Sequence, residues 1–329
     1  MTPHIPLARR LLLGSFALVL ALVPSAFATT AEDCYKANPT KVIDVSGLKK
    51  INKPVRLAIA GYQVSFVVRN KSTAHAMNLL GKGTAKSSME TFLGNVDYAL
   101  MQEIADAAYA DFVEQMKATG HQVLSDEEVK SAKAYAKLTK VPVSATNAHK
   151  VKLQNMHLIV VPAKGQELWF NKYDGLNAGK GADNVRVMGE LEKELQAVVI
   201  QPSIAIDFAY LDASGGKFAR KASVEAQNGM LLVPAATVYW STWGGGLVYT
   251  KFQDGVWVDG PTGKWSTAKS GNNASLVKGL AGLGIDIGPV SGKKAIVLEA
   301  EPEAFKTKSI EVLKAAHNLY RRGLENARK

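Results

Sequence analysis

The sequence predicts an α/β or α+β fold, in which a mixed β-sheet is packed with helices and further β-hairpins lie in the C-terminal half. Segments rich in β-branched and aromatic residues alternate along the chain with segments of helical apolar periodicity. The chain has 329 residues, of which 47% are hydrophobic, so it can bury a sizeable core. Both observations predict a folded protein of one large domain or two smaller ones.

The N-terminus has the order of a secretory signal. Arg9 and Arg10 precede an apolar run over residues 11–23, and the small-residue motif 26–28 follows directly. The run is shorter than the roughly 20 apolar residues that a membrane-spanning helix needs. We therefore expect residues 1–28 to be a cleavable signal peptide and the mature chain to be periplasmic or secreted, with no transmembrane segment.

Residues 29–54 are polar and mixed, and they form a lead-in to the globular region that we expect over residues 55–329. The only cysteine, Cys34, follows two acidic residues, which argues against a lipidated N-terminus. A lone cysteine forms no internal disulfide, so stability must come from a buried core. A division of the globular region near residues 175–185 remains an open alternative.

The elements of the first half follow from periodicity and capping residues. Residues 55–68 predict a strand broken or bulged at Gly61, and residues 69–95 predict a long surface loop. Apolar residues at spacings of three and four predict a helix over residues 97–119, with Asp97 at its start and Gly120 after its end.

The remaining elements follow in chain order. Ser125 and Glu128 stand at capping-box spacing before a predicted helix. Helices are predicted at residues 126–138, 186–196 and 302–328. Strands are predicted at residues 121–124, 156–162, 167–173, 198–211, 222–226, 231–243, 247–252, 256–258 and 295–298. Residues 174–183 and 269–292 are rich in glycine and are expected to be loops.

The charge is moderately basic, with a net charge of +11 for the whole chain. Apart from Arg321 and Arg322 the cations are scattered, so the sequence gives no dense basic block. Export makes nucleic acid an unexpected partner. A positive surface could instead contact anionic lipid or a cell-wall polymer, so peripheral membrane contact stays open.

No catalytic template fits its chemical requirements. The Ser-x-x-Lys match at residues 291–294 follows the Lys-Ser-Gly match at 269–271, the reverse of the order in penicillin-binding enzymes. The glycines at 175–181 are one residue short of a phosphate-binding loop. The histidines of the mature chain stand singly, unlike zinc ligands. We therefore predict no catalytic residue, no metal site and no cofactor, while a site assembled only in three dimensions remains open.

The densest aromatic region is the candidate binding site. Aromatic side chains on strands can bind sugars or a partner protein, and the competing interpretation is that they fill the core of the sheet. The candidate ligand-binding residues are Tyr239, Trp240, Trp243, Tyr249, Trp257 and Trp265.

Two segments carry a resemblance to known envelope proteins. The helix over residues 97–119 continues into residues 117–125, Lys-Ala-Thr-Gly-His-Gln-Val-Leu-Ser, and residues 205–216 form a strand that closes in a turn with Asp and Gly. This pattern resembles the curli secretion lipoprotein and the lipoproteins that activate penicillin-binding proteins. The resemblance implies an α/β envelope protein with a non-enzymatic accessory role. The acylated cysteine of those families has no counterpart here, and no functional residue carries over.

The sequence therefore predicts an exported cell-envelope accessory or binding protein that acts through a recognition surface, without catalysis. Its partner would be an envelope protein or a glycan. The alternative is an exported hydrolase that acts on cell-wall, carbohydrate or ester substrates. A third interpretation, a structural subunit of an envelope assembly, predicts stable self-association.

Overall fold

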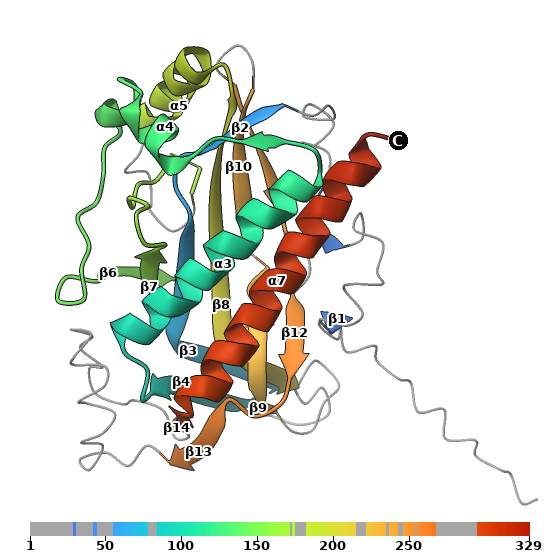
Figure 1. The fold of residues 1–329 in the computed structure, drawn as a ribbon. Helices are drawn as coiled ribbons and strands as arrows, with labels where there is room; N and C mark the ends of the chain where they lie inside the picture. Colours follow the sequence, from blue (N-terminus) through green and yellow to red (C-terminus); the bar gives the residue numbers. More distant parts are fainter. Residues whose placement is uncertain are drawn as a thin grey trace, which may run out of the picture.

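The described residues form a mixed sheet of fourteen strands with helices on both faces (Figure 1), in agreement with the predicted fold class. The computed structural model describes residues 29–30, 42–44, 55–77, 84–171, 173–174, 182–214, 222–234, 237–242, 246–253, 255–267 and 295–329. The predicted signal peptide, Cys34 and the glycine-rich segment 269–292 lie outside these residues.

The described strands and helices alternate through much of the chain. The strands are β1 (Thr29–Thr30), β2 (Arg56–Ile59), β3 (Gln63–Met77), β4 (Thr84–Gly94), β5 (Gln122–Val123), β6 (His149–Leu153), β7 (Met156–Pro162), β8 (Val198–Ser214), β9 (Ser223–Leu232), β10 (Thr237–Thr242), β11 (Gly246–Lys251), β12 (Val256–Asp259), β13 (Gly263–Thr267) and β14 (Ala295–Ala300). The helices are α3 (Tyr98–Ala118), α4 (Asp126–Ser131), the 3₁₀ turn η2 (Tyr135–Lys137), α5 (Ala182–Leu195) and α7 (Pro302–Ala327).

Strand β8 lies at the centre of the sheet and pairs with four other strands. It runs parallel to β2 and β3 and antiparallel to β9 and β10. Its first residues lie between β2 and β10, and its later residues continue beside β3 and β9. Strands from both sides of residues 175–185 therefore belong to one sheet.

Helices α3 and α7 lie side by side across one face of the sheet (Figure 1). The Asp97 side chain accepts a hydrogen bond from the Leu100 N–H at 2.8 Å, and Gly120 follows the helix with a φ of 82°. The predicted helix and its two end signals are thus confirmed. Glycine suits this last position because other residues rarely adopt a positive φ.

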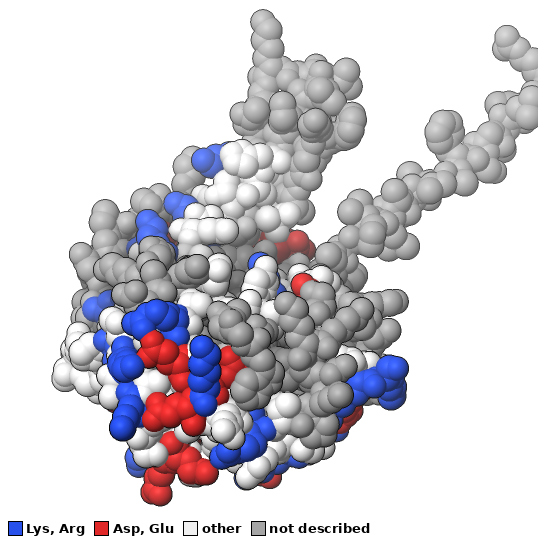
Figure 2. Space-filling model, turned by 90° about the horizontal axis from the view of Figure 1, so that it is seen from above, with Lys and Arg blue, Asp and Glu red and all other residues white. Residues whose placement is uncertain are grey.

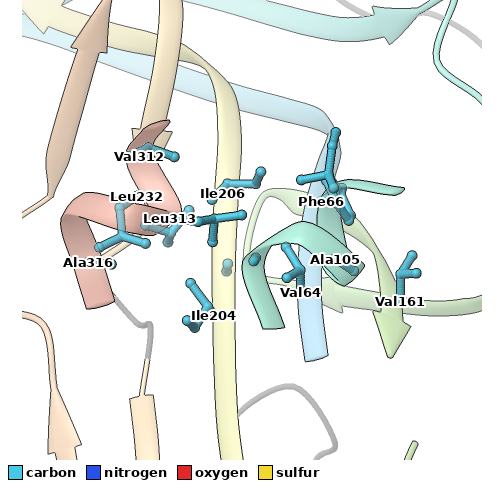
Figure 3. Close-up of a cluster of buried hydrophobic side chains, with 14 of the residues drawn as sticks. Val64, Phe66, Ala105, Val161, Ile204, Ile206, Leu232, Val312, Leu313 and Ala316 are labelled. Atoms are coloured by element: carbon cyan, nitrogen blue, oxygen red, sulfur yellow. The ribbon is translucent and has the colours of Figure 1, made fainter. Parts of the chain in front are cut away.

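The main core lies between these helices and the sheet (Figure 3). Ala105 of α3 faces β3, and Val312 and Leu313 of α7 face the centre of β8 (Figure 3). The buried residues labelled there are Val64, Phe66, Ala105, Val161, Ile204, Ile206, Leu232, Val312, Leu313 and Ala316. We call this side of the sheet the helix-covered face.

The opposite face is covered at one end by α4, η2 and α5, which form a second apolar cluster with Ala58, Ala60 and Val199. The predicted capping box is present, because the Glu128 N–H donates to Ser125 Oγ at 3.2 Å and the Ser125 N–H donates to Glu128 Oε2 at 2.8 Å. The predicted helix 126–138 is too long. After α4 ends, the Glu194 carboxylate accepts the N–H groups that follow Ala132, at 2.7 and 2.8 Å.

The prediction of a surface loop over residues 69–95 is wrong. Strand β3 continues to Met77 and pairs antiparallel with β4. The hairpin has few large apolar residues of its own, and Ala74 and Met89 pack against Val224 of β9. Strand formation here depends on cross-strand pairing and on packing against β9, and local composition does not indicate either one.

The predicted strand at 167–173 is also absent. Trp169 forms a single bridge to Lys140, and its indole N–H donates to the Ala60 carbonyl at 2.8 Å. The described residues of this segment are therefore bonded to the sheet by side chains instead of joining it as a strand. Strands β6 and β13 were not predicted.

Charges of both signs lie close together at the end of the molecule seen in Figure 2. Glu190 of α5 bonds to both Lys137 and Arg186. This mixed distribution gives no single-sign field over the described part of that end. Among the described helices, none combines the length and the apolar character needed to cross a bilayer.

Arg328, which follows the C-terminal helix α7, bonds to His121, which lies three residues after α3. The Val55 N–H donates to His121 Nδ1 at 3.1 Å, and Arg328 Nη2 lies 3.0 Å from His121 Nε2. This arrangement requires a neutral imidazole. Burial, followed by the nearby Arg328 charge, lowers the pKa of His121 from 6.5 to about 4.

We predict that acidification destabilises the fold through His121. Between pH 6.5 and pH 4 the unfolded chain binds this proton and the folded chain does not, so the free energy of unfolding falls as pH falls. The loss is up to about 3 kcal/mol. When it is measured by urea unfolding across this pH range, the free energy of unfolding should fall less steeply with pH in His121→Gln than in the parent protein. Equal slopes for the parent protein and His121→Gln would contradict the assignment.

Candidate functional site

Polar side chains form two rows across the face of the sheet opposite α3 and α7. Gln63 of β3 pairs with Ser203 of β8, and Ser203 pairs with Thr237 of β10. In the next row Gln201 of β8 pairs with Tyr239 of β10. Directly paired residues share a face of a sheet. All five side chains are buried, and we call them the polar rows.

The polar rows hold a short segment, Asn171 with Tyr173 and Asp174, against the sheet. Asn171 Nδ2 donates to Gln201 Oε1 at 2.9 Å. Gln63 Nε2 donates to Asp174 Oδ2 at 3.2 Å and to Ser203 Oγ at 3.0 Å. Burying an amide or a carboxylate without a hydrogen-bond partner costs free energy. These bonds therefore satisfy the buried polar groups of the sheet and also fix the position of the segment.

Three further bonds fix the backbone of this segment. The Tyr239 hydroxyl donates to the Tyr173 carbonyl at 3.0 Å. The Tyr173 N–H donates to Asn171 Oδ1 at 2.8 Å, and the Asp174 N–H donates to the Asn171 carbonyl at 3.2 Å. Burial, together with the negative charge of Asp174, raises the pKa of Tyr239, which keeps its hydroxyl protonated as a donor.

The Tyr173 side chain is nevertheless exposed, and so is that of Tyr249, the strand partner of Tyr239. Tyr173 and Tyr249 are 53% and 50% exposed, and they are the only exposed large hydrophobic side chains of the described residues. Tyr249 of β11 is the cross-strand partner of Tyr239, and the Tyr173 carbonyl accepts from the Tyr239 hydroxyl, so both exposed residues adjoin Tyr239. We call Tyr173, Tyr239 and Tyr249 the tyrosine surface.

A rigid aromatic side chain held in the open is suited to recognition. Tyrosine offers a large apolar ring and a hydroxyl, and it loses little conformational entropy when a partner binds. The hydrogen bonds beneath Tyr173 reduce the ordering cost further. The arrangement therefore presents an exposed aromatic side chain on a backbone that is fixed by hydrogen bonds.

The predicted aromatic residues lie in different environments. Trp240 is fully buried on the helix-covered face, where its indole donates to Thr250 Oγ1 at 3.1 Å. Trp257 packs near Tyr210 and Trp265 near Phe208, with ring centroids 5.9 and 6.3 Å apart. Trp243 lies outside the described residues. Of the predicted set, the structure brings together Tyr239 and Tyr249.

Sequence reasoning missed Tyr173 and the residues of the polar rows other than Tyr239. The signal was present as alternation: Gln63 and Ser65 interrupt one apolar strand at a spacing of two, and Gln201 and Ser203 interrupt another. A period of two places each pair on one face of a strand. Two such strands predict a polar sheet face, which needs a polar partner segment.

A second buried polar group lies between the helices and the sheet. His317 Nδ1 donates to Asp111 Oδ2 at 2.7 Å, and the Tyr62 hydroxyl donates to His317 Nε2 at 2.9 Å. His317 is fully buried, and burial lowers its pKa despite Asp111. A substrate cannot reach this imidazole without opening the core, so the group joins α3 and α7 structurally.

The Ser203 hydroxyl is bonded to an amide and not to a base. Ser203 Oγ accepts from the Gln63 amide, which cannot take up a proton from it. Within the part of the chain that the structure describes, no three His, Cys, Asp or Glu residues gather closely enough to hold a metal ion. The site offers aromatic contact through Tyr173 and Tyr249.

We predict that Asn171→Ala destabilises the protein and loosens Tyr173. The change leaves the buried Gln201 amide oxygen and the Tyr173 N–H without their partner, at a cost of about 1 to 3 kcal/mol. Thermal unfolding should report the loss, and hydrogen exchange should be faster at the Tyr173 amide. The control is Asn147→Ala, which alters an exposed turn and should change stability by less than about 1 kcal/mol. A fully stable Asn171→Ala with unchanged exchange would contradict the role of the network.

Comparisons of this chain with protein-family models, with curated proteins and with solved structures find no significant match. The resemblance to envelope lipoproteins therefore stays a prediction, and the function is argued from the residues of this chain alone.

Proposed function

We propose that the protein is an exported accessory protein of the cell envelope that binds a partner through the tyrosine surface, without catalysis. One observation carries the proposal: the two exposed tyrosines both adjoin a buried third tyrosine, which belongs to a hydrogen-bonded polar sheet face. The charged, apolar and small-residue order of residues 1–28 supports export.

The polar rows support a role beyond stability. Apolar residues at Gln63, Gln201 and Ser203 would cover the same face without needing polar partners, because a polar group gains little over water by pairing inside a protein. The polar rows instead determine the position of one segment, whose exposed residue is Tyr173. Such positioning is the usual requirement of a binding site.

The hydrolase alternative has weaker support. Its active site would need a histidine or an acid that a substrate can reach, next to a nucleophile. The described His317–Asp111 pair is bonded to Tyr62 in the core, and Ser203 is bonded to an amide. These contacts support binding more than they support hydrolysis.

We predict that the double variant Tyr173→Ala, Tyr249→Ala loses the partner. The immobilised mature protein is exposed to a detergent extract of its own cell envelope, and the retained material is quantified. Loss of two exposed aromatic contacts of about 1 kcal/mol or more each should lower retention at least about tenfold. The melting temperature should change little because both rings are half exposed.

Two controls accompany this measurement. The double variant Glu114→Ala, Lys117→Ala removes two exposed side chains of α3 and should retain the partner. Tyr173→Phe, Tyr249→Phe keeps both rings and should retain most of it. Full retention by the folded alanine variant at Tyr173 and Tyr249 would place recognition elsewhere on the molecule.

A further inference from the structure

We propose that the partner is an extended polypeptide segment that adds to the outer edge of β11 as a further strand. The inference rests on the proposed function and names the class of partner for the tyrosine surface. It follows from the direction of the backbone groups along β11.

Strand β11 pairs with β10 and with no other strand of the described residues. The edge of β11 that faces away from β10 is bonded, just at the C-terminal end of the strand, to the short described segment 42–44. The Asp44 N–H donates to the Lys251 carbonyl at 2.9 Å, and the Gln253 N–H donates to the Val42 carbonyl at 2.8 Å. Ile43 thereby forms an antiparallel bridge with Phe252.

These two bonds establish which backbone groups point outward. The N–H and C=O groups of successive strand residues point to alternate sides. Since those of Lys251 and Gln253 point away from β10, those of Tyr249 and Leu247 point the same way. No described strand pairs with Leu247 or Tyr249 on that side. An edge of this kind is a template for another strand.

The position of Tyr249 favours a polypeptide over a glycan. Tyr249 presents an exposed ring on the face of the sheet and outward backbone groups at its edge. An added strand would use both, because its backbone would bond to the edge while the Cβ atom of an apolar or aromatic residue lay about 5 Å from the Cβ atom of Tyr249. A glycan has no backbone of N–H and C=O groups at strand spacing that could match this edge. Residues 42–44 already show that this edge accepts antiparallel pairing.

The test compares Leu247→Pro with Leu247→Ala. Proline removes the outward N–H of residue 247 and leaves the ladder with β10 intact, because the inward bonds belong to the neighbouring residues. Both changes remove the leucine side chain, which packs partly against the α5 cluster. In the envelope-extract capture we expect Leu247→Ala to retain the partner and Leu247→Pro to retain at least about tenfold less. The Tyr249 ring is present in both variants.

Two treatments of the extract separate the partner classes. Digestion with proteinase K should abolish retention by the parent protein, whereas periodate oxidation of glycans should leave it unchanged. Retention that survives the proteinase, or that is lost on periodate oxidation, overturns the polypeptide class. Equal retention by Leu247→Pro and Leu247→Ala overturns strand addition, while the proposed function stands if the double alanine variant at Tyr173 and Tyr249 still loses the partner.

Two measurements on the isolated protein test whether the edge is free. The Tyr249 amide should exchange with solvent rapidly, while the Val248 amide, which points toward β10, should exchange slowly. Slow exchange at Tyr249 overturns the proposal because it means that the edge is already covered. A concentration-dependent dimer that Leu247→Pro abolishes assigns the edge to a second copy of this chain and also overturns it.

Discussion

The structure depends on the hydrogen bonding of β8 along both of its edges. This strand has 17 residues, and it bonds to β2 and β3 from the first half of the chain and to β9 and β10 from the second. A parallel pair such as β3 and β8 cannot form through a local turn, so the pairing requires the chain between them to fold around the sheet. Helix α7 then covers strands that lie far from it in sequence, including β9 and β12.

The two faces of β8 make different contacts because successive side chains of a strand point to opposite sides of the sheet. Ile200, Ile204 and Ile206 enter the core under α3 and α7. Gln201 and Ser203 face the other way, where they bond to side chains that bring Asn171 and Asp174 to the sheet. The tyrosine surface is a consequence of this alternation. A hydrophobic face at these positions would bury the same area but would not determine where Tyr173 lies.

The sequence predicts the regular elements well where periodicity and capping act locally. The α3 helix, the capping box at Ser125 and the β8–β9 hairpin all follow from nearby residues. The β3–β4 hairpin was missed because its strands are stabilised by pairing and by Val224 of β9, not by their own composition. Of the candidate site, Tyr239 and Tyr249 were predicted. Trp240 was not distinguishable from them by type or spacing, since burial depends on which face of β10 it occupies. The sequence did not indicate Tyr173 as a site residue, because its position depends on hydrogen bonds to residues far away in sequence.

The most direct test of this account is a double-mutant cycle between Asn171 and Tyr173 in partner retention. If Asn171 acts by positioning Tyr173, Asn171→Ala lowers retention in the parent background and has no further effect once Tyr173 is alanine. The account predicts this non-additive result. Independent, additive losses from the two changes would contradict it, because Asn171 would then affect binding by a route other than Tyr173.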